Sequence, residues 1–236
     1  VMIASSIISL FFLTHIVLAT STSLSVDTDA IRSQSNTPQQ TVMWHMPRHA
    51  PQVALTFDDG PDETVTPQLL NVLREHNVTA TFFLVGHMMS KAPHVVRQIA
   101  RDGHVLANHT WAHYRLDEQS LPHIERQLAS TTAVFESLGV TMAPYVRPPG
   151  GRFNDYVVRA AKDQGLTMVM WDVNAADYRR PNGQHPHPDA IVARVLRGVR
   201  PGSIVLMHNG PATVAALPRI ITALKKKSYR MGPLTW

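Results

Sequence analysis

Short runs of hydrophobic residues recur along the chain from Pro51 onward and alternate with longer amphipathic stretches. These runs are short, rich in β-branched and aromatic residues, and bounded by Gly, Pro, Asn or Asp, which is typical of buried strands. The predicted strands cover residues 53–57, 79–85, 104–107, 145–146, 167–173 and 203–207.

The stretches between these runs repeat apolar residues at helical spacing, as at Leu69, Leu70 and Leu73. Several of them stop at a glycine, such as Gly139, which is a common helix terminator. The predicted helices cover residues 66–75, 92–101, 117–138, 153–163, 188–199 and 212–227. Because strands and helices alternate, the pattern predicts an α/β domain with a parallel sheet, either open or closed into a barrel.

The beginning of the chain does not follow this alternation. Residues 2–19 are almost uniformly apolar and are followed by small polar residues, which indicates an export signal. The length of the run would also permit an uncleaved membrane anchor. A buried N-terminal helix is disfavoured by the polar Ser/Thr/Gln stretch that follows. We therefore expect a signal peptide or anchor over residues 1–25, a polar linker over 26–50, and one folded domain over 51–236.

Composition narrows the class of function. Hydrophobic residues make up 44% and charged residues 17%, which is typical of a globular protein. The chain has no cysteine, so disulfide frameworks, cysteine nucleophiles and thiolate metal sites are excluded. The net charge is +5, but Lys and Arg form no long block and only 7% of residues are aromatic. We therefore expect no nucleic-acid partner.

Polar residues gather where the predicted strands end, which is the edge of a parallel sheet where ligands bind. They are Asp58, Asp59, Asn108, His109, His113, Arg147, Asn174, Asp177 and His208. A random scatter of titratable residues would not prefer one end of the strands. The sequence therefore predicts one site at this edge.

Two pairs in this set are suited to metal chemistry. On a helix, His109 and His113 would lie on one face and could bracket one metal ion, although such pairs also arise by chance in a chain with 13 histidines. Adjacent strand residues such as Asp58 and Asp59 point to opposite faces. The Gly60-Pro61 pair that follows either turns both carboxylates toward the site or makes a solvated turn. One carboxylate and two imidazoles would hold a divalent metal, which leaves the second carboxylate as a candidate general base.

Five motifs follow one another along the chain. They are Thr56-Phe57-Asp58-Asp59-Gly60-Pro61, His109-Thr110-Trp111-Ala112-His113, Arg147-Pro148-Pro149-Gly150-Gly151, Asn174-Ala175-Ala176-Asp177-Tyr178 and Leu206-Met207-His208. Between about Gln52 and Met231 the chain thereby resembles the polysaccharide deacetylases of the NodB-homology type, carbohydrate esterase family 4. Each motif alone is weak, but five in the family's order with compatible spacing are specific.

The resemblance implies a distorted (β/α)7-type barrel as a single catalytic domain. It also implies hydrolysis of acetyl groups on a polymeric sugar with a divalent metal, usually zinc and sometimes cobalt or nickel. The implied roles are metal ligand for Asp59, His109 and His113, general base for Asp58, orientation of that base for Arg147, general acid for His208, and an oxyanion contact through the backbone N–H of Gly150.

Three positions depart from the family pattern. Gly150 replaces an aromatic residue that walls the sugar groove, so we expect a wider or softer subsite. Asn174 replaces the Asp that supports the catalytic histidine, so we expect His208 to have a lower pKa than in relatives, with Asp172 as a candidate substitute on the same strand face. Tyr178 replaces the usual Trp and keeps an aromatic surface for the substrate.

The sequence therefore predicts a metal-dependent hydrolase that removes acetyl groups from N-acetylated sugars, such as GlcNAc or MurNAc of peptidoglycan or chitin oligomers. The alternatives are an acetylxylan-type O-deacetylase and a carbohydrate-binding relative that has lost catalysis. No Gly-x-Ser-x-Gly elbow is present, which counts against a serine esterase. We expect a monomer that is exported to the periplasm or the medium, or tethered to the envelope through residues 2–19.

Overall fold

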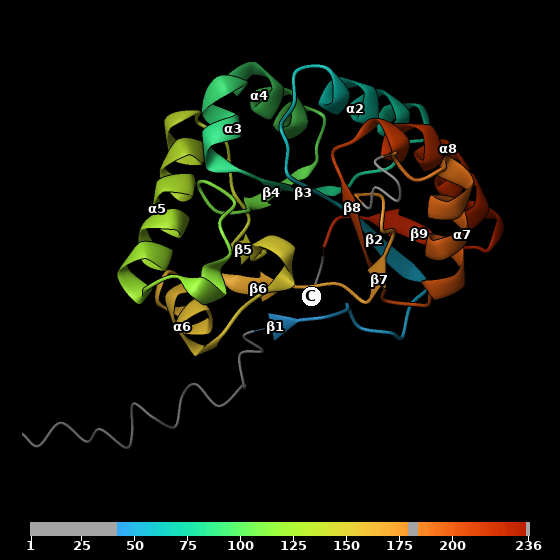
Figure 1. Ribbon diagram of the computed structural model, residues 1–236. Coiled ribbons are helices and arrows are strands. Elements are labelled where there is room, and N and C mark those ends of the chain that lie inside the picture. Colours follow the sequence, from blue (N-terminus) through green and yellow to red (C-terminus); the bar gives the residue numbers. More distant parts are fainter. Residues whose placement is uncertain (1–41, 179–183, 235–236) are drawn as a thin grey trace, which may run out of the picture. The chain divides into compact units, whose positions relative to one another are not determined.

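The computed structural model describes residues 42–178 and 184–234 (Figure 1). The predicted signal peptide or anchor therefore lies outside the described residues. In the described part, nine strands form one sheet in the order β1-β6-β5-β4-β3-β2-β8-β7, with β9 beside β2, and every pairing is parallel. The strands are β1 (Val42–Met43), β2 (Gln52–Asp58), β3 (Thr81–Leu84), β4 (Val105–Asn108), β5 (Tyr145–Val146), β6 (Thr167–Val169), β7 (Val173–Asn174), β8 (Ile204–His208) and β9 (Arg230–Gly232).

The sheet is curled, and the helices lie along its outer side (Figure 1). They are α2 (Val65–Glu75), α3 (Gly86–Lys91), α4 (Pro93–Arg101), α5 (Leu121–Ser137), α6 (Asp155–Asp163), α7 (Pro188–Gly198) and α8 (Pro211–Lys226), with short 3-10 turns η1 (Leu116–Glu118) and η2 (Pro149–Gly151). This curled parallel sheet with outer helices confirms the predicted (β/α)7-type fold and the single domain. Among the described helices, none has both the length and the apolar character needed to cross a bilayer.

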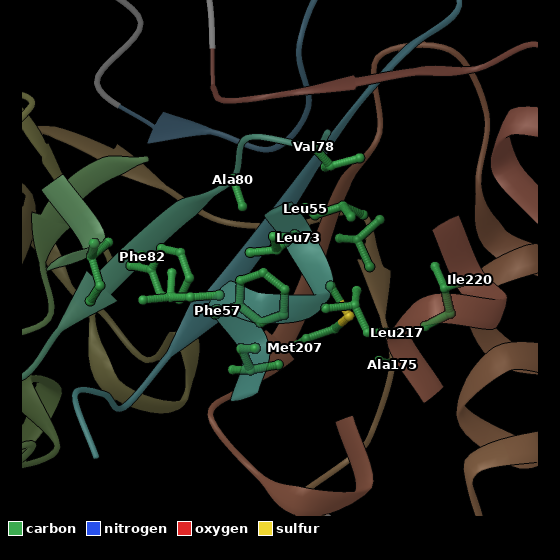
Figure 2. Close-up of a cluster of buried hydrophobic side chains, with 14 of the residues drawn as sticks. Leu55, Phe57, Leu73, Val78, Ala80, Phe82, Ala175, Met207, Leu217 and Ile220 are labelled. Carbon is green, nitrogen blue, oxygen red and sulfur yellow. The ribbon is translucent and has the colours of Figure 1, made fainter. Parts of the chain in front are cut away.

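The two faces of the sheet are both buried, which explains why the strands read as continuous apolar runs. On β2, Leu55 and Phe57 point outward and pack with Phe82 of β3 and Met207 of β8 against the helices (Figure 2). The alternate residues of β2 point inward, and the last of these is Asp58. A separate inner cluster fills the barrel and consists of Met43, Met46, Ala54, Phe83, Ala107, Tyr145, Val169, Ile204 and Leu234.

The predicted strand over residues 167–173 is wrong in extent, because it forms two strands. β6 ends at Val169 and β7 starts at Val173. The carbonyl oxygens of Val169 and Met170 accept hydrogen bonds from the side chain of Arg147, at 2.9 and 3.0 Å. Because these carbonyls accept from the buried guanidinium of Arg147, they do not pair with a neighbouring strand among the described residues. The chain therefore leaves the sheet between β6 and β7.

The folded part of the chain starts upstream of the expected domain boundary. β1 lies within the segment expected to be linker and pairs with β6. Met46 is buried, and its N–H donates to the carbonyl of Gly202 at 2.8 Å. Arg48 donates to Asp172 at 2.9 Å and to the carbonyl of Pro201 at 2.8 Å. These contacts hold residues 42–50 against β6 and against the residues that precede β7 and β8.

Candidate metal and catalytic site

A cavity of about 240 Å³ lies at the carboxyl ends of the strands. Its lining residues are Asp58, Asp59, His109, His113, Gly150, Trp171, Asn174, Tyr178, Leu206 and His208. Three residues of the predicted set, Asn108, Arg147 and Asp177, are not part of this lining, and Arg147 lies buried next to Asp58. A larger hollow between α5 and α6, of about 690 Å³, contains no histidine among its lining residues. The chemistry therefore points to the smaller cavity.

Asp58 is held by a buried arginine. It is the last residue of β2 and is only 3% exposed. Its Oδ1 accepts a hydrogen bond from Nη1 of Arg147 at 2.7 Å, and the same nitrogen donates to Oγ1 of Thr56 at 2.8 Å. The Arg147 guanidinium also lies 4.1 Å from the ring centre of Phe83. With Oδ1 fixed in this way, Oδ2 of Asp58 is the oxygen nearer to His109, 3.7 Å from its Nε2.

Asp59 reaches the same cavity because its backbone leaves the extended conformation. Its φ angle is 78°, in the left-handed region, so the alternation of the strand ends here and both carboxylates face the site. Oδ1 of Asp59 is buried and has no hydrogen-bond partner among the described residues. It lies 3.1 Å from Nε2 of His113 and 3.4 Å from Nε2 of His109.

The helical geometry expected for His109 and His113 is wrong, because they lie on a tight turn. Thr110 and His113 have φ angles of 67° and 57°. Oδ1 of Asn108 accepts from the N–H of Thr110 at 2.8 Å, and Oγ1 of Thr110 accepts from the N–H of His113 at 3.1 Å. The turn brings the two ring centres to 5.0 Å.

The orientation of the His109 ring follows from its partner. Its Nδ1 lies 2.7 Å from the backbone carbonyl of Arg147. A carbonyl only accepts, so Nδ1 is the donor of this bond and Nε2 is the ring nitrogen that faces Asp59. A hydrogen bond of this kind also fixes the orientation of a ligating imidazole.

Asp59, His109 and His113 fit a divalent cation. One ligand atom from each lies within 4.8 Å of the other two. A carboxylate with two imidazoles is a donor set typical of zinc and other divalent transition metals. Burial raises the pKa of the Asp59 carboxyl, but the two imidazoles outweigh burial and hold this pKa well below its usual value. The carboxylate is therefore ionised, as a ligand must be.

The partner of His208 is Asp177, a residue that the sequence placed at this edge but to which it gave no role. Nδ1 of His208 lies 2.8 Å from Oδ1 of Asp177, and the N–H of His208 donates to Oδ2 at 2.6 Å. Oγ1 of Thr213 donates to the same Oδ2. Burial lowers the pKa of His208, but the hydrogen bond and the charge of Asp177 outweigh burial and raise this pKa above its usual value.

The reason given for a lower His208 pKa than in relatives, the absence of a partner carboxylate, does not hold, because Asp177 supplies that carboxylate. Oδ1 of Asn174 accepts from the N–H of Ala176 at 2.7 Å, so Asn174 stabilises the turn. The alternative carboxylate, Asp172, accepts from Arg48 and from the N–H of Ile204 instead. Asp177 was visible in the fourth motif, but choosing it over Asn174 required the geometry of the turn.

Aromatic residues form part of the cavity wall. The ring of Tyr178 lies edge-on to that of His208, with 4.9 Å between their centres, and Tyr178 is 49% exposed. A Cβ at Gly151 would lie 2.5 Å from the ring of Trp171, a residue that sequence reasoning missed. A Cβ at Gly150 would meet no atom within 4 Å. The wall is therefore open at Gly150 and closed at Trp171.

Comparison with known proteins gives four concordant matches. A family model described as polysaccharide deacetylase matches residues 45–169. A peptidoglycan-N-acetylglucosamine deacetylase of Bacillus cereus is 38% identical over 197 residues, covering 82% of this chain and 91% of the relative. A chitooligosaccharide deacetylase of Sinorhizobium fredii is 38% identical over 195 residues, covering 76% and 88%. The crystal structure of the Bc1960 peptidoglycan N-acetylglucosamine deacetylase superposes with a TM-score of 0.78 at 34% identity, covering 83% of this chain and 91% of that one.

Proposed function

The chain belongs to the polysaccharide deacetylase family, and we propose that it is a metal-dependent enzyme that removes N-acetyl groups from GlcNAc-containing glycans. The observation that carries this proposal is the convergence of Asp59, His109 and His113 within 4.8 Å, with Asp58 beside them. The names of the two relatives make peptidoglycan and chitooligosaccharides the first substrates to test.

A divalent cation bound at these three residues would polarise the acetyl carbonyl and acidify the attacking water toward a pKa of about 7. Asp58 would accept a proton from the attacking water at Oδ2. Arg147 occupies Oδ1, so the base has one defined proton-accepting oxygen. Because the water is already acidified, a carboxylate is basic enough for this step.

His208 is suited to protonate the leaving amine. Its Nδ1–H is directed at Asp177, so Nε2 carries the proton that is given to the departing nitrogen. An amine needs this proton more than an alcohol does, because an unprotonated amide anion is a very poor leaving group. The raised pKa keeps more of the imidazole in the acid form at neutral pH, which favours amide over ester substrates.

One alternative, a carbohydrate-binding relative without catalysis, is disfavoured by the contacts of His208. The replacement at Asn174 pointed to such a relative, but Asp177 supplies the carboxylate that His208 needs.

We further propose that the enzyme acts outside the cytoplasm. The apolar run over residues 2–19 and the peptidoglycan named for the relative support this location.

Acetate release from peptidoglycan, chitooligosaccharides and acetylxylan tests the proposal, with and without a chelator. We expect release from the N-acetylated glycans, its loss on chelation, and its recovery when Zn²⁺, Co²⁺ or Ni²⁺ is added. Release from acetylxylan alone would identify an O-deacetylase. Bound metal without release from any of the glycans would favour the binding protein.

A further inference from the structure

Charge is separated between the two edges of the sheet. At the carboxyl edge, around the cavity, acidic residues outnumber basic ones in the part of the chain that the structure describes. The acidic side chains are Asp58, Asp59, Asp62, Glu63, Asp117, Glu118, Asp155, Asp177 and Asp189, and the basic ones are Arg115, Arg147, Arg152 and Arg219, the last of which pairs with Asp189. At the opposite edge, where the strands begin, basic residues outnumber acidic ones among the described residues.

Exposed basic side chains gather at this amino edge, around the start of β2. The amino-edge basic cluster consists of Arg74, Arg197, Arg200, Lys225, Lys226, Lys227 and Arg230, all of them exposed. These residues lie at the ends of α2, α7 and α8, just before β8, and at the start of β9.

Contacts between these elements make the cluster continuous. Nζ of Lys225 donates to the carbonyl of His76, which joins the ends of α8 and α2. The N–H of Arg230 donates to the carbonyl of Pro51 at 2.8 Å, and β8 and β9 both pair with β2. α8 also packs against α7.

Helix capping accounts for only part of this charge. Basic residues in a last turn are stabilised by the helix dipole, which suffices for Arg74, Arg197, Lys225 and Lys226. Lys227 and Arg230 lie beyond α8, and no ion pair to either is found among the described residues. Three acids lie near the cluster: Glu75 is at the end of α2, Asp102 faces Arg74 at 3.8 Å, and Asp172 pairs with Arg200 at 3.5 Å.

The described part of the chain begins at this same edge of the sheet. Val42 pairs with Met168, near the start of β6, and the two strands are parallel. The chain therefore enters β1 from the amino edge. By composition, the run over residues 2–19 is apolar enough for a membrane segment.

We propose that the amino-edge basic cluster docks on the surface of an anionic lipid bilayer, with the catalytic cavity turned away from the lipid. The proposal goes beyond the deacetylase activity and does not depend on it. Each Lys or Arg near an anionic surface strengthens binding about fivefold, and several act together. The acidic carboxyl edge is repelled by the same surface, so charge also sets the orientation.

Binding of the full chain to vesicles tests the proposal. Phosphatidylcholine vesicles with about 30% phosphatidylglycerol are compared with pure phosphatidylcholine vesicles at about 0.1 M salt, and the ratio of the two partition constants is measured. The apolar run contributes to both constants, so the ratio reports the charge. We expect Lys226→Gln/Lys227→Gln to lower the ratio about 25-fold. Lys225 is left in place because it bonds to His76.

The matched control is Arg115→Gln/Arg152→Gln, which removes the same net charge from the carboxyl edge and should leave the ratio within about twofold. An unchanged ratio in the lysine variant, or an equal fall in both variants, would overturn the proposal. So would tight, lysine-dependent binding to soluble polyglycerol phosphate without binding to anionic vesicles. Acetate release from a soluble chitooligosaccharide should match wild type in the lysine variant, which shows that it is folded and separates this test from that of the activity.

Discussion

The two sides of the cavity are built in different ways. On the proton-transfer side, Asp58 and His208 end neighbouring strands and face each other in the register of β2 and β8. Each has one charged partner, Arg147 at 2.7 Å and Asp177 at 2.8 Å. On the ligand side, Asp59, His109 and His113 lie on turns, and the nearest contacts between their donor atoms are 3.1 and 3.4 Å.

This difference follows from what each side does. A group that moves a proton needs a partner that fixes its protonation state and its orientation. A group that holds a cation needs a donor atom without a competing proton. The left-handed backbone of Asp59 and His113 costs some stability, which the surrounding structure must offset, and such strain is typical of functional sites.

The largest effect is expected on the ligand side. Asp59→Asn removes the only carboxylate of the three ligands but keeps a residue that tolerates positive φ. We expect loss of the bound metal and a fall in kcat/KM of at least about 10³-fold, because the metal supplies several kcal/mol of transition-state stabilisation. Metal content by mass spectrometry and acetate release measure the two effects. Asp155→Asn, on an exposed carboxylate at the same edge, is the control, and wild-type metal content in the Asp59 variant would contradict the assignment.

On the proton-transfer side, Asp58→Asn should separate catalysis from metal binding. We expect a fall in kcat of about 10²- to 10⁴-fold while the metal is retained. The variant also leaves Arg147 buried without a countercharge, so unfolding in denaturant should show a loss of up to about 3–5 kcal/mol. Undiminished turnover would remove Asp58 from the mechanism.

A smaller effect is expected one step from the reacting atoms. Asp177 raises the pKa of His208, so Asp177→Asn should lower this pKa and move the basic limb of the pH–rate profile to lower pH. The loss in kcat should stay below about 10²-fold, since the imidazole itself is retained. The matched control, Asn174→Asp, should leave the limb in place, because residue 174 bonds to Ala176 and not to His208. A limb that moves with residue 174 and not with residue 177 would reverse this assignment.

Asn174 and Asp177 also show what could not be predicted from the sequence. The motifs placed an acidic or amide group at both positions, and alternation along a strand favoured Asp172 as a substitute. The positive φ of Ala176 makes a turn that presents Asp177 to His208, and no periodic pattern encodes that turn. The strand ends themselves were predictable, because parallel strands deliver all their carboxyl ends to one edge.

The long elements of the fold were predictable from the sequence, and the short ones were not. Long periodic segments such as α5 and α8 were found, with their ends moved by a few residues. β1 and β9 have two and three residues, too few for any alternation, and they exist only because the remote strands β6 and β2 pair with them. α3 has only six residues and was also missed, because its position is set by tertiary packing.

The smallest effect is expected at the open part of the wall. Gly150 has a φ angle of 63°, so Gly150→Tyr should cost about 1 kcal/mol of stability from the backbone alone. The space around it is open, and an added ring there would contact the sugar. We expect KM for chitooligosaccharides to fall about two- to fivefold, the range of a modest aromatic contact. Gly150→Ala has the same backbone cost without the ring and should leave KM unchanged. An equal or higher KM in the tyrosine variant would mean that the groove is not narrowed from this position.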